Sequence, residues 1–132
     1  MKILLVLAGL GQIGLALGSL ALPRILGWRE ETARLKPLTR QVFWIYAGYI
    51  WSTNIAFGLV SSLAPGWLLD RTPLARAVAG FIAAYWGARL VLQLLVIDRK
   101  SAPAGAFFRA ADATLTAGFV GWTLVYGAVA LG

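Results

Sequence analysis

Residues 3–22 read ILLVLAGLGQIGLALGSLAL, an uncharged run that ends at Pro23. A helix needs about 20 mostly apolar residues to cross the hydrocarbon core of a bilayer. The run therefore predicts a transmembrane helix. The Met1-Lys2 pair ahead of it also fits the start of a signal peptide, but we expect the segment to be retained as a span.

Three more long intervals of low charge follow along the chain, separated by proline and glycine. The chain of 132 residues is 60% hydrophobic and 13% charged, whereas soluble domains are about 25% charged. Too few polar side chains are present to cover a soluble globule. We predict an all-α integral membrane protein, an antiparallel four-helix bundle that forms a single domain. Its expected spans are residues 3–22, 41–64, 74–97 and 110–131.

The Lys and Arg residues predict the orientation of these spans. Loops 23–40 and 98–109 hold eight of the 12 basic residues, and the other side of the membrane holds Lys2, Arg71 and Arg76. Loops rich in Lys and Arg stay in the cytoplasm. We therefore expect both loops in the cytoplasm and both termini outside, in a bacterial inner (plasma) membrane.

Loop 23–40 mixes apolar and charged residues, which predicts a short amphipathic helix on the membrane surface. The net charge of +7 then reflects topology and attraction to anionic headgroups of membrane lipids. We expect no nucleic-acid partner.

The chain contains no Cys and no His. This composition excludes thiolate chemistry, Ser-His catalysis and metals held by Cys or His. We predict no catalytic residue and no metal site. No carboxylate lies in the middle of an expected span, which argues against proton-coupled transport. The sequence encodes no cofactor site, and a bound lipid or quinone is the ligand class left open.

Glycines of the first span fit two interpretations. Gly9, Gly11 and Gly14 match the dinucleotide-binding pattern GxGxxG, but that pattern works only between a strand and a helix. The chain shows no alternation of strands and helices. We interpret the glycines as small residues for close helix contact, with Gly14 and Gly18 as the packing face of the first span.

Two other rows of small or amide side chains predict helix contacts. Asn54, Gly58 and Ser62 recur every fourth residue in the second span, which is typical of interhelical hydrogen bonding and close approach. Ala84 and Ala88 lie on a face of the third span that a four-helix bundle leaves uncovered. We therefore expect contact with a second copy of this chain or with other membrane subunits.

Each expected span carries a polar side chain at a similar depth. With a rise of about 1.5 Å per residue, Gln12, Tyr49, Arg89 and Thr116 lie roughly 10–16 Å from the cytoplasmic ends of their spans. An arginine at this depth costs about 2.5–3.5 kcal/mol and usually faces the bundle interior with a partner. We expect Asp112 to be that partner.

Asp98 is the second choice as partner, and Arg89 itself has two interpretations. One is a structural anchor between the third and fourth spans. The other is a site for an anion or a lipid headgroup. Stripes of polar side chains at helical spacing in the second and third spans extend the candidate site. The full set of candidate ligand-binding residues is Arg89, Gln93, Tyr85, Tyr49, Tyr46, Gln12, Thr116 and Asp112.

Aromatic residues fall into an outer and a deeper group. Trp28, Trp44 and Trp67 lie near the expected span ends, where indole rings are common, and we predict them to be interface anchors. The deeper group predicts either a wall around a ring-shaped or isoprenoid ligand or ordinary core packing. Its members are Trp51, Trp86, Tyr46, Tyr49, Tyr85 and Phe57.

The first half of the chain resembles a family of small membrane proteins. Its glycine-rich first span, followed by residues 46–49 (YAGY) and 56–59 (AFGL), resembles the DoxX-like group of small bacterial four-helix membrane proteins. The resemblance implies the four-helix fold. Members of that group are linked to quinone-dependent sulfur oxidation or to chaperone roles. Because these roles differ, the resemblance implies no single activity and no site residue.

Two functional classes remain. The first is a non-enzymatic accessory or assembly subunit of a membrane complex, which the many packing faces and few reactive groups favour. The second is a transporter, a channel or a quinone- or lipid-binding, redox-linked membrane protein that uses an intramembrane site at Arg89.

Overall fold

The computed structural model describes residues 1–96 and 105–132. Its regular secondary structure is helical throughout these residues, with no strand, which confirms the all-α class. The expected end of the third span at residue 97 lies outside the described residues. The helices are α1 (Lys2–Ser19), α2 (Leu22–Ile25), α3 (Trp28–Ala33), α4 (Pro37–Leu63), α5 (Pro65–Leu68), α6 (Pro73–Leu95) and α7 (Ala106–Leu131).

Three helical stretches of the described chain are long and apolar enough to cross a membrane. They are Lys2–Ile25, Pro73–Leu95 and Ala106–Leu131, and they correspond to the first, third and fourth expected spans. Helix α4 has 27 residues, but polar and aromatic side chains such as Tyr49 and Asn54 lower its hydropathy, and it is not among the three. The three apolar stretches support the prediction that the chain is a membrane protein.

Prolines determine where α4 and α6 begin. Pro37 and Pro73 lie in the first turn of their helices. A backbone N–H at this position would have no partner within the helix, so proline is tolerated there. Helix α4 therefore begins before the expected span start at residue 41. Thr72 caps α6, because its hydroxyl oxygen accepts a hydrogen bond from the backbone N–H of Ala75 at 3.1 Å.

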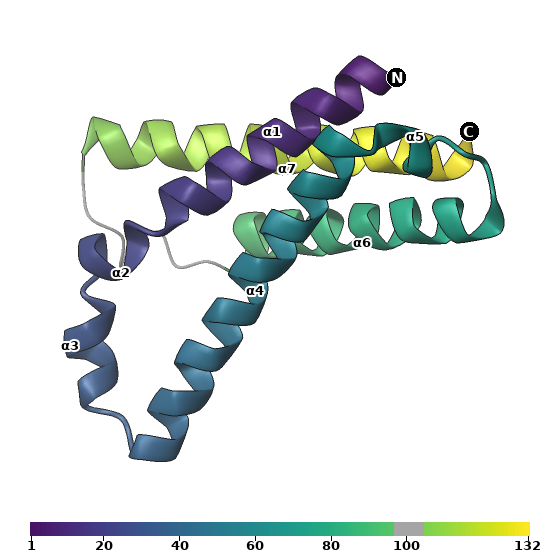
Figure 1. Cartoon of the computed structure of the whole chain (residues 1–132). Helices are drawn as coiled ribbons and strands as arrows, with labels where there is room; N and C mark the ends of the chain where they lie inside the picture. The colour runs from purple at the N-terminus through teal and green to yellow at the C-terminus, as the bar shows by residue number, and fades with distance from the viewer. Residues whose placement is uncertain (97–104) are drawn as a thin grey trace.

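The long helices pack as two pairs, α1 with α4 and α6 with α7, and α1 also contacts α7. Figure 1 shows that consecutive long helices run in opposite directions and that α1 and α4 cross the other pair at an angle. The N-terminal half of α4 extends away from α6 and α7. Helices α2 and α3 connect the start of α4 to the end of α1.

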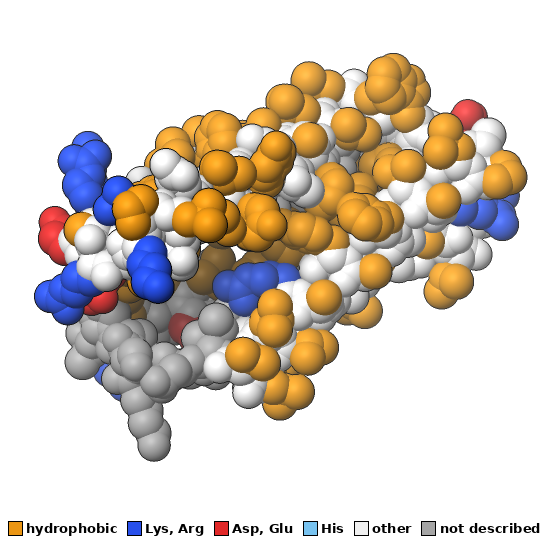
Figure 2. Space-filling view, turned by 90° about the horizontal axis from the view of Figure 1, so that it is seen from below, with side chains coloured by type: hydrophobic (Ala, Val, Ile, Leu, Met, Phe, Trp, Pro, Cys, Tyr) orange, Lys and Arg blue, Asp and Glu red, His pale blue; other side chains and the backbone are white. Residues whose placement is uncertain are grey.

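The surface suits a lipid environment. Hydrophobic side chains cover most of the face in Figure 2, whereas charged side chains gather mainly at its two ends. Apolar patches of this extent mark contact with a membrane or with another protein. One basic side chain lies between the two ends, at the edge of a hollow in the surface.

Helices α1 and α4 approach closely at a pair of glycines. A Cβ added to Gly9 would lie 2.7 Å from the carbonyl oxygen of Gly58. A Cβ added to Gly58 would lie 2.8 Å from the carbonyl oxygen of Gly9 and 2.6 Å from Cγ1 of Ile13. Only glycine leaves room for the two backbones here, and Gly58 is buried as its row in the sequence predicts.

The expected packing of Gly14 and Gly18 within the chain is wrong. Both residues are exposed, and a Cβ added to either would meet no atom within 4 Å. The buried face of α1 carries Gln12 and Gly9 instead. Because successive helical residues are about 100° apart, Gly14 points roughly 200° away from Gln12.

Candidate functional site

A buried amide joins the four long helices. Gln12 of α1 is fully buried, and its Nε2 donates to the hydroxyl of Tyr126 in α7 at 2.6 Å and to the carbonyl oxygen of Ala8 at 3.2 Å. Its Oε1 accepts a hydrogen bond from Nε1 of Trp86 in α6 at 2.9 Å. The hydroxyl of Ser61 in α4 shares a hydrogen bond with the hydroxyl of Tyr126.

These residues, Gln12, Ser61, Trp86 and Tyr126, form the Gln12 network. Both amide N–H groups of Gln12 and its oxygen have partners, which uses the donors that the side chain offers. Across residues 1–96 and 105–132, no buried side-chain nitrogen or oxygen lacks a hydrogen bond. The structure therefore places Gln12 in helix packing, apart from the predicted layer around Arg89.

A second polar cluster lies on α6 and α7 and contains the predicted arginine. Nη1 of Arg89 donates to Oε1 of Gln93 at 3.1 Å, and Nε2 of Gln93 donates to Oδ1 of Asp112 at 2.5 Å. Gln93 thus connects Arg89 with Asp112, the predicted partner. The other predicted partner, Asp98, lies outside the described residues.

Two more residues complete this Arg89 cluster of Arg89, Gln93, Asp112, Thr116 and Phe119. The hydroxyl of Thr116 donates to the carbonyl oxygen of Asp112 at 2.9 Å, within its own helix. The guanidinium carbon of Arg89 lies 4.9 Å from the centre of the Phe119 ring, a cation–π contact that stabilises a partly desolvated charge. Phe119 was not foreseen in the sequence, which gave no reason to single out one phenylalanine of that span.

The predicted tyrosines occupy different places. Tyr85 donates its hydroxyl hydrogen to Oδ1 of Asn54 at 2.7 Å, which links α6 to α4. Tyr49 is 68% exposed and Tyr46 is 63% exposed, although Tyr46 still contributes to the wall of a cavity. The structure therefore does not bring Tyr49 to Arg89.

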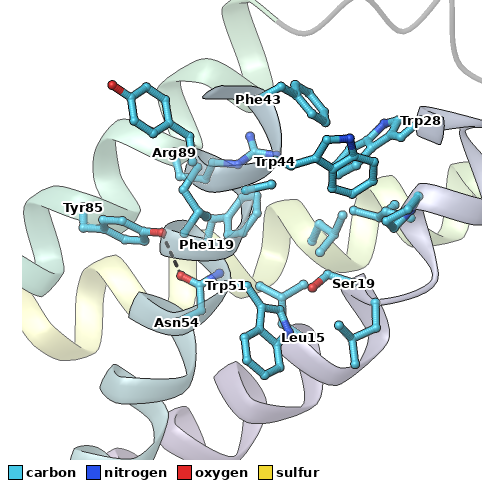
Figure 3. A pocket seen from close by; sticks show the side chains of 18 of the residues that line it. Leu15, Ser19, Trp28, Phe43, Trp44, Trp51, Asn54, Tyr85, Arg89 and Phe119 are labelled. Atoms are coloured by element: carbon cyan, nitrogen blue, oxygen red, sulfur yellow. Dashed lines mark hydrogen bonds between the residues drawn. The ribbon is translucent and has the colours of Figure 1, made fainter. Parts of the chain in front are cut away.

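A cavity of about 650 Å³ lies where α4 diverges from the other helices. Residues of α1, α2, α3, α4, α6 and α7 line it, and Figure 3 shows Arg89 and Phe119 facing it together with Trp44 and Trp51. We call it the aromatic cavity. Its aromatic residues are Trp28, Phe43, Trp44, Tyr46, Trp51, Tyr85, Trp86 and Phe119.

Hydrogen bonds and ring contacts hold the outer wall of the aromatic cavity. Trp28 in α3 packs edge to face on Phe43 in α4, with ring centres 5.1 Å apart. Nε1 of Trp44 donates to the hydroxyl of Thr32 at 3.3 Å, and Nε1 of Trp51 donates to the carbonyl oxygen of Ala16 at 2.9 Å. These contacts tie α3 and α1 to α4.

A glycine positions α3 for these contacts. Gly27 precedes α3 with φ of +65°, a left-handed conformation that L side chains adopt at a cost. The chain can therefore turn sharply after α2, which brings Trp28 against the first turns of α4.

The polar groups that line the aromatic cavity are few. They come from Ser19, Asn54, Arg89, Tyr46 and Tyr85 and from the tryptophan rings, and the lining within residues 1–96 and 105–132 contains no acidic side chain. Among the described residues, no group of three or more His, Cys, Asp or Glu side chains is arranged to hold a metal ion. The site offers hydrogen-bond donors and one positive charge to a ligand.

Some residues of the site follow from the sequence and others do not. Of the deeper aromatic group, Trp51, Trp86, Tyr46 and Tyr85 line the aromatic cavity, whereas Tyr49 and Phe57 are not among its lining residues. The predicted interface anchors Trp28 and Trp44 also line it. Ser61 and Tyr126, which complete the Gln12 network, were not foreseen. The sequence around a single hydroxyl in an apolar helix does not show which residue of another helix it will contact.

Comparison of this chain with protein families, with curated proteins and with solved structures finds no match. The resemblance to DoxX-like proteins therefore stays a prediction.

Proposed function

We propose that the protein is a four-span membrane protein in which α4 is the additional span. A helix of 27 residues extends about 40 Å, enough to cross a hydrocarbon core of about 30 Å. Close contact of α4 with α1 and their opposite directions support an antiparallel arrangement. The five Lys and Arg residues of segment 23–40 favour a cytoplasmic position for that end of the molecule and an external position for both termini, in a bacterial inner membrane.

The topology is tested by cysteine labelling, because the chain contains no native cysteine. Gly66→Cys and Thr39→Cys both place a thiol at an exposed position, at opposite ends of α4. We expect an impermeant maleimide to label Gly66→Cys in intact cells and to label Thr39→Cys only after the cells are opened. The parent chain is the unlabelled control, and labelling of Thr39→Cys in intact cells would reverse the orientation.

Within this topology, we propose that the protein binds a lipid-soluble molecule in the aromatic cavity, with its polar head at Arg89. The observation that carries this proposal is an arginine in the wall of an aromatic cavity of about 650 Å³. Ligand cavities generally have volumes of about 300–1,000 Å³ and combine an apolar lining with a few polar groups. A charged residue within a span is costly in lipid, and such residues mark ion or substrate pathways and ligand sites in many membrane proteins. A lipid or a quinone would suit such a cavity.

This proposal is tested by the small molecules that leave the membrane with the protein. The chain is extracted in native-lipid particles, and bound lipids and quinones are quantified by mass spectrometry. We expect Arg89→Leu to lose at least fivefold of one species that the parent retains. Arg76→Leu, near the other end of α6, is the matched control and should retain it. Equal content in all three proteins would contradict the proposal.

A role as accessory or assembly subunit is the second candidate function. It is favoured by small residues on outward faces, namely Gly14 and Gly18 on α1 and Ala84 and Ala88 on α6, which are exposed. Small residues let helices of another subunit approach closely in lipid. The protein content of the same particles tests this role, since a second membrane protein or a second copy should be present in a fixed ratio. Particles that hold one copy and no other protein would remove it.

A further inference from the structure

The polar groups around the aromatic cavity select the chemistry of a ligand head. Asn54 uses its amide oxygen to accept from Tyr85, and its Nδ2 remains as a donor, as Figure 3 shows with the oxygen turned toward Tyr85. Arg89 has only donors. Because none of the described residues that line it is acidic, the cavity favours a head that accepts hydrogen bonds and carries negative charge.

From these groups we infer that the ligand is a single-chain amphiphile with a carboxylate head, a fatty acid, whose carboxylate binds the guanidinium of Arg89. This inference rests on the proposed binding function and adds the class of the ligand. The hydrocarbon chain lies along the aromatic wall formed by residues such as Trp44 and Trp51.

The surroundings of Arg89 favour an anion over a neutral carbonyl. Its connection to Asp112 runs through the neutral amide of Gln93, so Asp112 does not neutralise the guanidinium by direct contact. The guanidinium carbon lies 4.9 Å from the centre of the Phe119 ring, and Nη1 donates to Gln93, which leaves Nε and Nη2 as donors for a ligand. A carboxylate matches the planar guanidinium with two parallel hydrogen bonds and places a negative charge opposite its positive charge, whereas a neutral carbonyl offers one acceptor oxygen and no charge.

The volume of the aromatic cavity favours one hydrocarbon chain. A cavity of about 650 Å³ has room for roughly twenty atoms other than hydrogen, if each takes about the 30 Å³ that a water molecule occupies. Palmitate, with about eighteen such atoms, fits this volume at the same scale. A phospholipid with two acyl chains needs more than twice the space and would have to leave most of its length outside.

The four tryptophans that line the aromatic cavity allow binding of a fatty acid to be followed by their fluorescence. Dibromostearic acid quenches indole fluorescence on contact, and its methyl ester has the same chain without the charge. Both probes are titrated into the purified full chain in detergent, at a pH that ionises the free acid. Excess palmitate then separates binding in the cavity from partition into the micelle, because only binding in the cavity is reversed.

We expect the acid to produce the palmitate-sensitive quenching at a concentration at least tenfold lower than the ester. Arg89→Leu should abolish this difference between acid and ester. Arg89→Lys should keep part of it, because lysine retains the charge but lacks the planar fork. Arg76→Leu, on the same helix, should behave as the parent.

The outcomes separate this inference from the binding function on which it rests. Equal affinity for acid and ester, with quenching that palmitate reverses, would leave a lipid-binding cavity and overturn the carboxylate head. Displacement of the acid by decylubiquinone at lower concentration than by palmitate would assign the cavity to a quinone and also overturn it. Absence of any reversible quenching would defeat both proposals.

Discussion

Replacing Gly58 with valine is expected to prevent stable packing of α1 on α4. Any Cβ at this position would lie 2.8 Å from the carbonyl oxygen of Gly9, a backbone atom that cannot turn aside. The two helices would have to separate along their contact. Overpacking of this kind typically lowers the free energy of unfolding by about 1–3 kcal/mol. Because the backbone itself must move here, we expect a loss at the upper end of this range or above it.

Gly14→Val is the matched control for this substitution. It introduces the same side chain into a long helix, but the added atoms face open space, and we expect unfolding in a denaturing detergent to be almost unchanged. The midpoint of unfolding, followed by circular dichroism, measures both variants. A Gly58→Val protein as stable as Gly14→Val would show that the glycine contact does not hold the helices together.

Replacing Gln12 with leucine is expected to cause the second large loss of stability. It removes hydrogen bonds to Trp86 and Tyr126 and leaves a buried indole N–H without its acceptor. Interhelical hydrogen bonds in membranes contribute about 0.6–2 kcal/mol each, and an unsatisfied buried group adds about 1–3 kcal/mol. We expect a total loss of roughly 2–7 kcal/mol.

Tyr126→Phe provides a graded comparison in the same network. It keeps the ring and the Trp86 to Gln12 hydrogen bond but removes the hydroxyl shared by Gln12 and Ser61. We expect it to lose less stability than Gln12→Leu in the same unfolding experiment. If Gln12→Leu unfolds at the same detergent concentration as the parent, the buried amide contributes nothing to the contact among the four helices.

The sequence predicts the helices well because a long uncharged segment in lipid can be stable only as a helix. An apolar segment cannot leave its backbone polar groups unpaired there, and a helix pairs them within the segment. The polar side chains also report which face turns inward. Had Gln12 been used to orient the first span, Ala8, Gly9 and Ala16 would have been assigned to the buried face and Gly14 to the outer face.

The site is less predictable, because it depends on how far apart two helices lie. Arg89 is identified by its cost in the membrane, a property of the residue and its position in the span. The aromatic cavity exists because α4 diverges from the other helices, and Trp28 of α3 forms part of its wall. No periodicity within a single span encodes that angle, so Trp28 and Trp44 look like interface anchors in the sequence.

The division of the long helices into two pairs has a consequence for biosynthesis. Helices in membranes form first and associate afterwards, and contacts between nearby segments close at small entropic cost. Pairing of α1 with α4 needs no residue beyond the first half of the chain, so these helices can associate while α6 and α7 are still being translated. The hydrogen bond from Gln12 to Tyr126 spans 114 positions. It can form only after Tyr126 has left the ribosome, as can the hydrogen bond between Ser61 and Tyr126, so these two contacts join the two pairs of helices late.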